Sequence, residues 1–132
     1  MIFKGRTVCK GIAEGAALVS KTPLSFYGGI DPYTGRIIEK NHELLGQVVK
    51  DKILIFPYGK GSTVGSYVLY QMVKNKTAPK AIINIETEPI IAAGCILGGI
   101  PLVDGFSDQS ILNIKNGDKV RVDADSGIIE LL

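Results

Sequence analysis

The feature that most constrains this chain is a short apolar run that leads through a glycine-rich turn into a helical pattern. Residues 53–56 (Ile-Leu-Ile-Phe) are uncharged and rich in β-branched side chains, which predicts a buried strand. Val64, Val68 and Met72 then recur at four-residue spacing, which predicts a helix. Residues 59–66, between the two patterns, hold three glycines and small hydroxyl residues. The stretch therefore predicts a strand–turn–helix unit of an α/β fold.

Such a turn is suited to an anion or to a reaction site. Glycines let backbone N–H groups face inward, and a helix start leaves N–H groups unpaired with a partial positive charge behind them. The same residues also allow a purely structural role, because Ser62 and Thr63 are preferred N-cap residues. The pattern alone leaves both interpretations open. It is not a Walker A loop, since Lys60 precedes the last glycine instead of following it.

The composition narrows the class of protein. A chain of 132 residues fits one domain, which we expect to span residues 1–132. The net charge is only +2 and the lysines are scattered, so binding to nucleic acid or to a membrane surface has no electrostatic support. Residues 1–6 carry charge where a signal peptide is apolar, and no apolar run approaches the roughly 20 residues that cross a bilayer. We expect a cytoplasmic protein.

Residues that ligate metals are few. Cys9 and Cys95 lie far apart in the sequence, and His42 is the only histidine. An iron–sulfur cluster takes three or four thiolates, and a zinc site is equally hard to assemble from this set. The sequence therefore predicts no metal site in this chain. We expect both cysteines to be buried as small hydrophobic residues, and His42 to have a structural or surface role.

The centre of the chain predicts a βαβαβ core. Residues 81–85 form a second short apolar run, and residues 100–103 form a third. Between them we expect a helix over residues 90–97, with Thr87 as its N-cap and Pro89 just inside. Buried strands joined by helices favour a parallel sheet.

Both ends of the chain are predicted to be rich in strands. Residues 2–18 indicate two short strands with turns, and alternation followed by a turn in residues 117–132 indicates a hairpin. Residues 23–35 are dense in turn-forming residues, yet they include Phe26 and Tyr27. We therefore expect this segment to be an ordered loop that packs against other residues.

Four blocks occur in the order of a known family: residues 3–6, 23–35, 59–66 and 99–104. On these blocks the chain closely resembles the small subunits of archaeal phosphomevalonate dehydratases, which are swivel-domain chains of the aconitase X superfamily. The resemblance covers essentially the whole chain. Its two most specific blocks read S-F-x-G-G-x-D-P-x-T-G and G-x-G-S-x-x-G-S, and they are specific in combination.

The resemblance implies an α/β fold, a swivelling β/β/α domain like the small mobile domain of aconitases. It implies a large partner subunit that holds a [4Fe-4S]-type iron–sulfur cluster. The implied reaction is the dehydration of (R)-5-phosphomevalonate to trans-anhydromevalonate 5-phosphate in the archaeal modified mevalonate pathway of isoprenoid biosynthesis. The family's serine proton acceptor falls on Ser62. Thr63 stands where relatives often have a second serine, and it keeps the hydroxyl group.

The chemistry of the turn is compatible with this reaction. Loss of water from a β-hydroxy acid needs a base for the proton next to the carboxylate and a Lewis acid for the hydroxide, a task suited to iron with an open position. A serine hydroxyl is a poor base unless positive charge stabilises its alkoxide. A helix N-terminus contributes only about 0.3–1 kcal/mol per exposed interaction. A dry interface with the partner has to supply the rest.

We expect the cleft around Ser62 to be lined by two segments. They contribute Gly59, Lys60, Gly61, Thr63, Gly65 and Ser66 from the turn, and Gly28, Gly29, Asp31 and Thr34 from the loop. Two structural alternatives stay open: Asp31 in a turn that bonds its own backbone, and Lys60 as a solvated loop lysine. A partner interface would also predict an exposed apolar cleft around Phe26, Tyr27 and Tyr58.

Other functions are weaker candidates. Within the superfamily, the alternative is the small subunit of a hydroxyproline dehydratase, which acts on a different β-hydroxy acid. A second class is a non-catalytic swivelling binding module of the phosphohistidine type, whose tail also reads G-D-x-V-x-V-D-x-x-x-G-x-I. That function needs a histidine on a loop before a helix, and His42 has no such setting. A third class, a purely structural partner protein, has no positive sign in the sequence.

Overall fold

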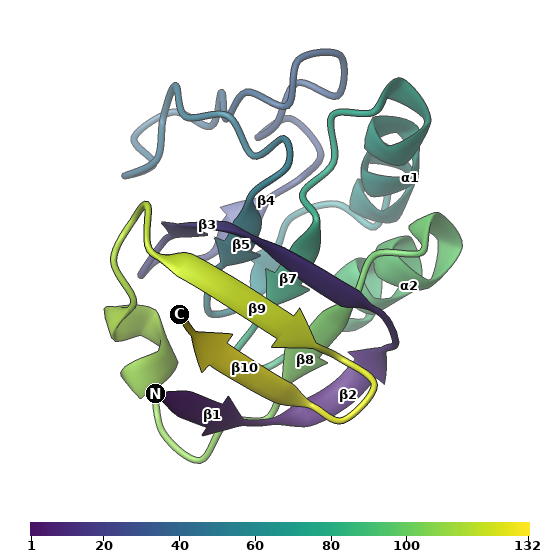
Figure 1. Ribbon diagram of the computed structural model, residues 1–132. Coiled ribbons are helices and arrows are strands. Elements are labelled where there is room, and N and C mark those ends of the chain that lie inside the picture. The colour runs from purple at the N-terminus through teal and green to yellow at the C-terminus, as the bar shows by residue number, and fades with distance from the viewer.

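The computed structural model describes residues 1–132, in which strands from both ends of the chain surround a central α/β unit (Figure 1). Two helices and a short 3-10 helix accompany ten strands. The elements are β1 (Ile2–Lys4), β2 (Arg6–Cys9), β3 (Ile12–Val19), β4 (Leu24–Ser25), β5 (Ile53–Ile55), β6 (Gly59–Lys60), α1 (Gly65–Asn75), β7 (Ala81–Ile83), α2 (Pro89–Gly98), β8 (Leu102–Asp104), η1 (Ser110–Asn113), β9 (Lys119–Asp123) and β10 (Ile128–Leu131).

The predicted βαβαβ core is confirmed. Strands β5, β7 and β8 pair in parallel, and α1 and α2 connect them in chain order. Every residue of these three strands is buried, because other layers cover both faces of the parallel sheet. Burial on both faces explains why β5 and β7 are continuous apolar runs without alternation, and why β8 is apolar up to its last residue, Asp104.

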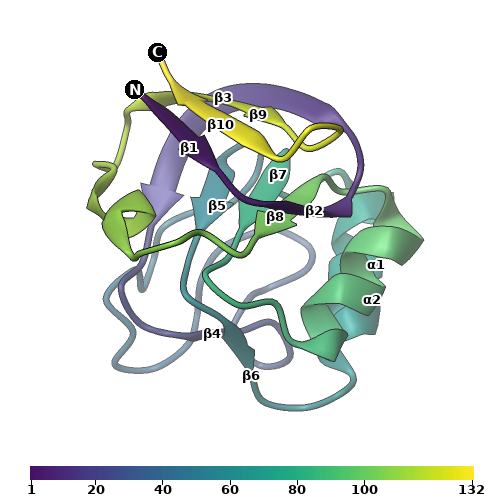
Figure 2. The ribbon, with the colours of Figure 1, turned by 90° about the horizontal axis from the view of Figure 1, so that it is seen from below.

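The larger sheet folds back on itself in two layers (Figure 2). Its strand order is β1-β10-β9-β3-β5-β7-β8-β2. The long strand β3 joins the layers, since it pairs in parallel with β5 and antiparallel with β9. Strands β1 and β2, at opposite ends of this order, are separated in the chain only by Gly5, whose N–H donates to the Gly127 carbonyl at 2.8 Å. The two ends of the sheet therefore meet at one bend.

Two apolar cores fill the space between the layers. On β5 the side chains alternate, with Ile53 and Ile55 in the core between the β-layers and Leu54 in the core beneath the helices. The other large members of the helix-side core include Leu24, Phe26, Leu69, Met72, Ile82 and Ile91, and those of the inner core include Val19, Ile83, Val103, Ile111, Val120, Val122 and Ile129. The result is a β/β/α arrangement. Neither helix is long and apolar enough to span a bilayer.

Several details differ from the sequence-based predictions. The N-terminal segment forms three strands instead of two, because the chain bends at Gly5 and turns at Gly11. The loop is ordered as predicted, but Phe26 is buried against Phe56, with ring centroids 6.2 Å apart. The expected apolar cleft is therefore wrong at Phe26.

The start of α2 is also capped differently. Glu88, not Thr87, is the N-cap, and its carboxylate accepts the N–H groups of Ile90 and Ile91 at 2.9 and 2.8 Å. A carboxylate at this position satisfies two unpaired donors of the first turn. Pro89 lies in the first turn, as predicted. The N–H of Thr87 donates instead to the Asp104 carboxylate at 3.0 Å.

Asp104 ties three elements together at the end of β8. Its buried carboxylate accepts two hydrogen bonds from the Arg6 guanidinium, at 2.9 and 3.0 Å, besides the bond from Thr87. Burial alone would raise the pKa of Asp104, but the hydrogen bonds from Arg6 and Thr87 outweigh it and hold this pKa below its ordinary value. The ionised carboxylate is thus the form that the fold stabilises.

We predict that Asp104→Asn lowers the free energy of unfolding by about 1.5–3 kcal/mol at neutral pH, the range for hydrogen bonds to charged groups. Because the folded pKa lies below the unfolded value of about 3.9, this stabilisation is complete above that value and is lost as the pH falls through the folded one. Urea unfolding of both proteins from pH 7 to pH 3 should show the gap narrowing in acid. A gap that stays constant would contradict the role of the charge.

Candidate functional site

Two segments far apart in the sequence lie side by side beyond the end of β5. Strand β6 pairs in parallel with β4, so that Leu24 is opposite Gly59 and Ser25 is opposite Lys60 (Figure 2). This small ribbon brings the first half of the loop, residues 24–29, against the turn that carries Ser62. The sequence predicted that the turn and the loop lie together. The structure shows this for the first half of the loop.

Ser62 lies in an exposed turn immediately before α1. Its hydroxyl oxygen accepts the N–H of Val64 at 3.2 Å, and its carbonyl accepts the N–H of Gly65 at 3.0 Å. The N-cap of α1 is Val64, which has helical dihedrals and no side-chain cap. Neither Ser62 nor Thr63 is therefore the N-cap residue of α1, although the Ser62 hydroxyl satisfies one backbone N–H just before the helix, as a structural serine does. Ser62 thus offers an exposed hydroxyl group whose oxygen accepts one backbone N–H near the start of a helix.

Of the six other predicted site residues in the turn, three are buried and support its backbone, and three are exposed. Gly59 is buried against the Glu88 and Ile91 side chains at the start of α2. Gly65 and Ser66 are buried as well, and the Ser66 hydroxyl donates to the Thr63 carbonyl at 3.1 Å. These three residues hold the shape of the turn. Lys60, Gly61 and Thr63 are exposed beside Ser62.

Gly61 is needed where the turn meets the loop. Its φ is +95°, and a Cβ built on it would lie 2.6 Å from the Ser25 hydroxyl oxygen. That hydroxyl in turn donates to the Tyr27 carbonyl at 3.0 Å. Only a glycine lets the two segments approach this closely next to Ser62.

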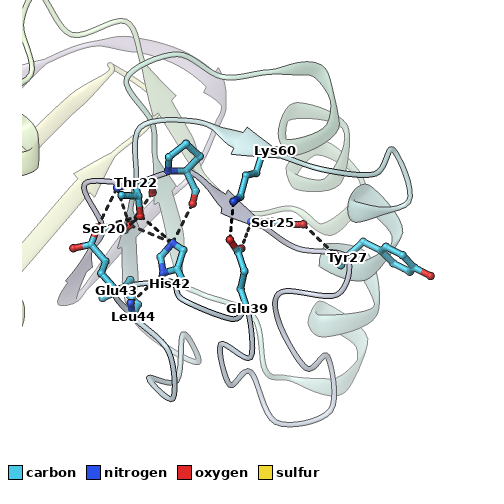
Figure 3. A network of polar contacts seen from close by, with 10 residues as sticks. Ser20, Thr22, Ser25, Tyr27, Glu39, His42, Glu43, Leu44 and Lys60 are labelled. Atoms are coloured by element: carbon cyan, nitrogen blue, oxygen red, sulfur yellow. Dashed lines mark hydrogen bonds and ion pairs between the residues drawn. The ribbon is translucent and has the colours of Figure 1, made fainter.

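Lys60 is held by Glu39, a residue that the sequence analysis missed (Figure 3). The ammonium nitrogen lies 2.8 Å from Glu39 Oε2, while Glu39 Oε1 accepts the Ser25 N–H at 2.9 Å. Burial raises the pKa of Glu39, but the bonds from Lys60 and Ser25 outweigh it, so the pKa lies below its ordinary value. Lys60 is therefore not a freely solvated loop lysine.

An open hollow of about 390 Å³ adjoins this ion pair. It is lined by Ser25, Tyr27, Gly28, Gly29, Glu39, Lys60 and Gly61. Gly28 and Gly29 thus lie in one hollow with Lys60, as the sequence suggested. Nothing in the local pattern around residue 39 indicated Glu39, because its partner lies 21 positions further along the chain (39 to 60).

Asp31 and Thr34 lie elsewhere. The Asp31 carboxylate accepts the N–H of Tyr33 at 2.9 Å. Asp31 therefore forms a turn with its own part of the backbone, one of the two alternatives that the sequence left open. Their part of the loop is attached to the far end of α1, where the Thr77 hydroxyl donates to the Pro32 carbonyl at 2.7 Å. Since α1 has 11 residues and is roughly 16 Å long, this attachment lies far from the turn that precedes its first residue. The structure does not bring Asp31 or Thr34 together with Ser62.

His42 belongs to a polar network that fastens the segment carrying Glu39 (Figure 3). Its Nδ1 accepts the Leu44 N–H at 3.0 Å, so Nε2 carries the proton and donates to the Pro23 carbonyl at 3.0 Å. Next to it, Glu43 accepts the N–H groups of Lys21 and Thr22 at 2.8 and 3.1 Å. His42 is buried, which agrees with a structural role.

The residues of this chain do not fit a metal or an iron–sulfur cluster. No three His, Cys, Asp or Glu side chains are grouped as ligands. Cys95 is fully buried as expected, and burial raises the pKa of its thiol far above the ordinary value. Cys9 is only partly buried, contrary to expectation, and its sulfur lies 3.6 Å from the Cys95 carbonyl oxygen.

Comparison with known proteins identifies the family. The family model described as the aconitase X swivel domain matches residues 2–131. This chain belongs to the aconitase X swivel domain family. The resemblance and the fold expected from it are thereby confirmed, and the β/β/α arrangement described above is the swivel domain of that family.

The relatives of this swivel domain align with it over at least 90% of their own length. Phosphomevalonate dehydratase small subunits from Methanosarcina mazei and Methanocella arvoryzae are 55% and 57% identical to it, over 98% and 99% of this chain and 90% and 99% of theirs. One chain in the crystal structure of Thermococcus kodakaraensis aconitase X in its holo form superimposes on this chain with a TM-score of 0.95 at 52% identity. The match covers all of this chain and 98% of the other.

We predict that Gly29→Ala destabilises the site more than Gly28→Ala. A Cβ on Gly29 would collide with the Ser25 carbonyl oxygen, which is backbone and cannot rotate away. A Cβ on Gly28 would meet nothing within 4 Å, and costs only the strain of φ +77°, about 1–2 kcal/mol. Gly29 has no positive φ, so its substitution costs the overpacked contact alone, which we expect at or above the upper end of the usual ~1–3 kcal/mol because backbone atoms have to move. Thermal unfolding of both variants tests the order, and equal losses would contradict it.

Proposed function

We propose that this chain is the small subunit of a phosphomevalonate dehydratase, and that it acts only together with a large subunit. The observation that carries the proposal is identity of 50% or more, over essentially the full length, to small subunits of that name. The reaction removes water from (R)-5-phosphomevalonate and gives trans-anhydromevalonate 5-phosphate, in the archaeal modified mevalonate pathway. One C–H bond next to the carboxylate and one C–O bond break, and a C=C double bond forms.

In this proposal Ser62 is the proton acceptor. Its hydroxyl is exposed, so a substrate held by another subunit can reach it. The Val64 N–H that it accepts, together with the nearby start of α1, stabilises negative charge on the oxygen. Lys60 lies two residues away with its ammonium paired to Glu39, and Gly28, Gly29 and Gly61 line the hollow beside that pair.

The chain alone does not complete the site. No histidine or carboxylate makes a hydrogen bond to Ser62, and the turn is open to water, which weakens every charge interaction in it. Four large exposed apolar side chains flank the turn: Tyr27, Tyr58, Val64 and Tyr67. Their burial against a large subunit would exclude water and leave Ser62 in a dry interface.

We place the iron–sulfur cluster in the large subunit. This chain has two cysteines, one of them fully buried, and neither belongs to a group of ligands. We also place the complex in the cytoplasm, where free thiols such as Cys9 and Cys95 stay reduced. The role left to this chain is to accept the proton and to close the site.

The test is reconstitution. Each subunit is expressed separately, combined anaerobically with iron and sulfide, and assayed for water loss from 5-phosphomevalonate, with hydroxyproline as a comparison substrate. We expect activity only from the pair, and only on the phosphorylated substrate. We expect Ser62→Ala to lower kcat by roughly 10²–10⁴-fold, the usual contribution of a proton-transfer group.

The control is Ser107→Ala, which removes another exposed serine hydroxyl from a loop outside the site. It should leave kcat unchanged. Gel filtration shows whether each variant still binds the large subunit. A Ser62→Ala pair that assembles and turns over normally would refute the proton-acceptor assignment, and activity on hydroxyproline alone would refute the substrate.

A further inference from the structure

Glu39 connects the two segments that form the hollow beside Ser62. One carboxylate oxygen holds the Lys60 ammonium at 2.8 Å, and the other accepts the Ser25 N–H at 2.9 Å (Figure 3). Its side chain is only 16% exposed, whereas that of Lys60 is 50% exposed. Both residues line the hollow, with the carboxylate mostly buried and the lysine half exposed.

The partly buried position of Glu39 makes this pair more effective than an ordinary surface ion pair. Pairs between two exposed side chains contribute little, because water screens them and both side chains lose conformational freedom. Here the carboxylate is already fixed by its bond to the Ser25 backbone, so only the lysine has to be ordered. Without that partner, the flexible four-carbon side chain of Lys60 is free to turn into solvent.

The segment that carries Glu39 is itself fastened in place. The Glu39 N–H donates to the Gly29 carbonyl at 3.1 Å, and its own carbonyl accepts the His42 N–H at 3.3 Å. Three and four residues further on, His42 and Glu43 bond the backbone of residues 21–23. Glu39 therefore presents its carboxylate from a preorganised backbone, as a supporting residue of a site should.

The position of Lys60 matters for the chemistry of Ser62. Only Gly61 separates them in the chain, and the packing of Gly61 against Ser25 fixes the course of the backbone between them. A serine that accepts a proton needs positive charge at a defined distance from its oxygen. The contact that fixes the Lys60 ammonium therefore also fixes where the two charges of this ion pair lie relative to the serine.

We propose that Glu39 is a positioning residue of the dehydratase site: it holds the Lys60 ammonium and the Ser25–Gly29 loop in one arrangement beside Ser62. This inference rests on the proposed function. Glu39 does not touch the reacting atoms in it, and its effect on the reaction passes through Lys60.

Glu39→Gln isolates that effect. The glutamine amide oxygen still accepts the Ser25 N–H, but its NH₂ group replaces the oxygen that held Lys60 and cannot accept from the ammonium. In the assembled pair of subunits we expect kcat to fall about tenfold while KM changes less than threefold, because the lost interaction serves the proton transfer. Lys60→Gln should lower kcat by a similar factor.

The double variant decides whether the two residues act together. If Glu39 acts through Lys60, Glu39→Gln causes no further loss in the Lys60→Gln background. Full multiplication of the two losses would mean that Glu39 acts on its own, and would overturn the inference.

Glu43→Gln is the matched control. It is the same substitution on the same segment, in a carboxylate that accepts several hydrogen bonds but does not touch Lys60. We expect a lower thermal midpoint, with a much smaller loss of kcat than Glu39→Gln causes. An equal loss of kcat in Glu43→Gln would point to general loosening of the segment and would also overturn the inference.

The outcomes separate this inference from the proposed function. A wild-type pair that fails to dehydrate 5-phosphomevalonate refutes the proposed function and this inference with it. An active wild type that loses turnover in Ser62→Ala but not in Glu39→Gln refutes the inference alone.

Discussion

Strands β5, β7 and β8 are buried on both faces, and the rest of the chain is arranged to cover those faces. Helices α1 and α2 cover one face, and the layer of β1, β10, β9 and the first half of β3 covers the other (Figure 2). Each cover contributes its own apolar core, so one set of three short strands lies between two cores. The loops that follow these parallel strands then emerge at one edge, where α/β proteins commonly place their sites.

The candidate site combines apolar support with polar fastening. On the side that faces the core, Gly59 packs against the start of α2, and Gly65 packs against the start of α2 and against Phe26. On the solvent side, Glu39 joins the loop to the turn, because its carboxylate accepts the Ser25 N–H and pairs with Lys60. Such an arrangement fixes the backbone around Ser62 while leaving its hydroxyl accessible. In the proposed function this exposed hydroxyl, with the exposed Tyr27, Tyr58 and Tyr67 around it, would be one half of a site that the large subunit completes.

The sequence predicted those elements whose signals are local. The strands around Leu54, Ile82 and Leu102, both helices and the C-terminal hairpin follow from apolar runs, periodicity and turn residues within short windows. Only the resemblance to a family distinguished Ser62 from an ordinary turn serine, and its role as proton acceptor stays a prediction.

Features that depend on distant contacts escaped prediction. Glu39 is defined by Lys60 and Ser25, which lie 21 and 14 positions away in the chain, and it has no repeating pattern around it. Glu88, not Thr87, caps α2 because its carboxylate accepts two N–H groups of the first turn, while Thr87 is bonded to Asp104, a contact that only the folded sheet creates. Phe26 was expected at the surface, yet the loop folds inward to pair it with Phe56.

The bend at Gly5 has a consequence for association. The two edge strands of the main sheet, β1 and β2, have only three and four residues, so the sheet offers no long free edge to which another chain can add a strand. Contacts made with this sheet by another subunit must therefore use side chains and loops. A domain that docks in this way separates from its partner without breaking backbone pairing, which suits repeated opening and closing.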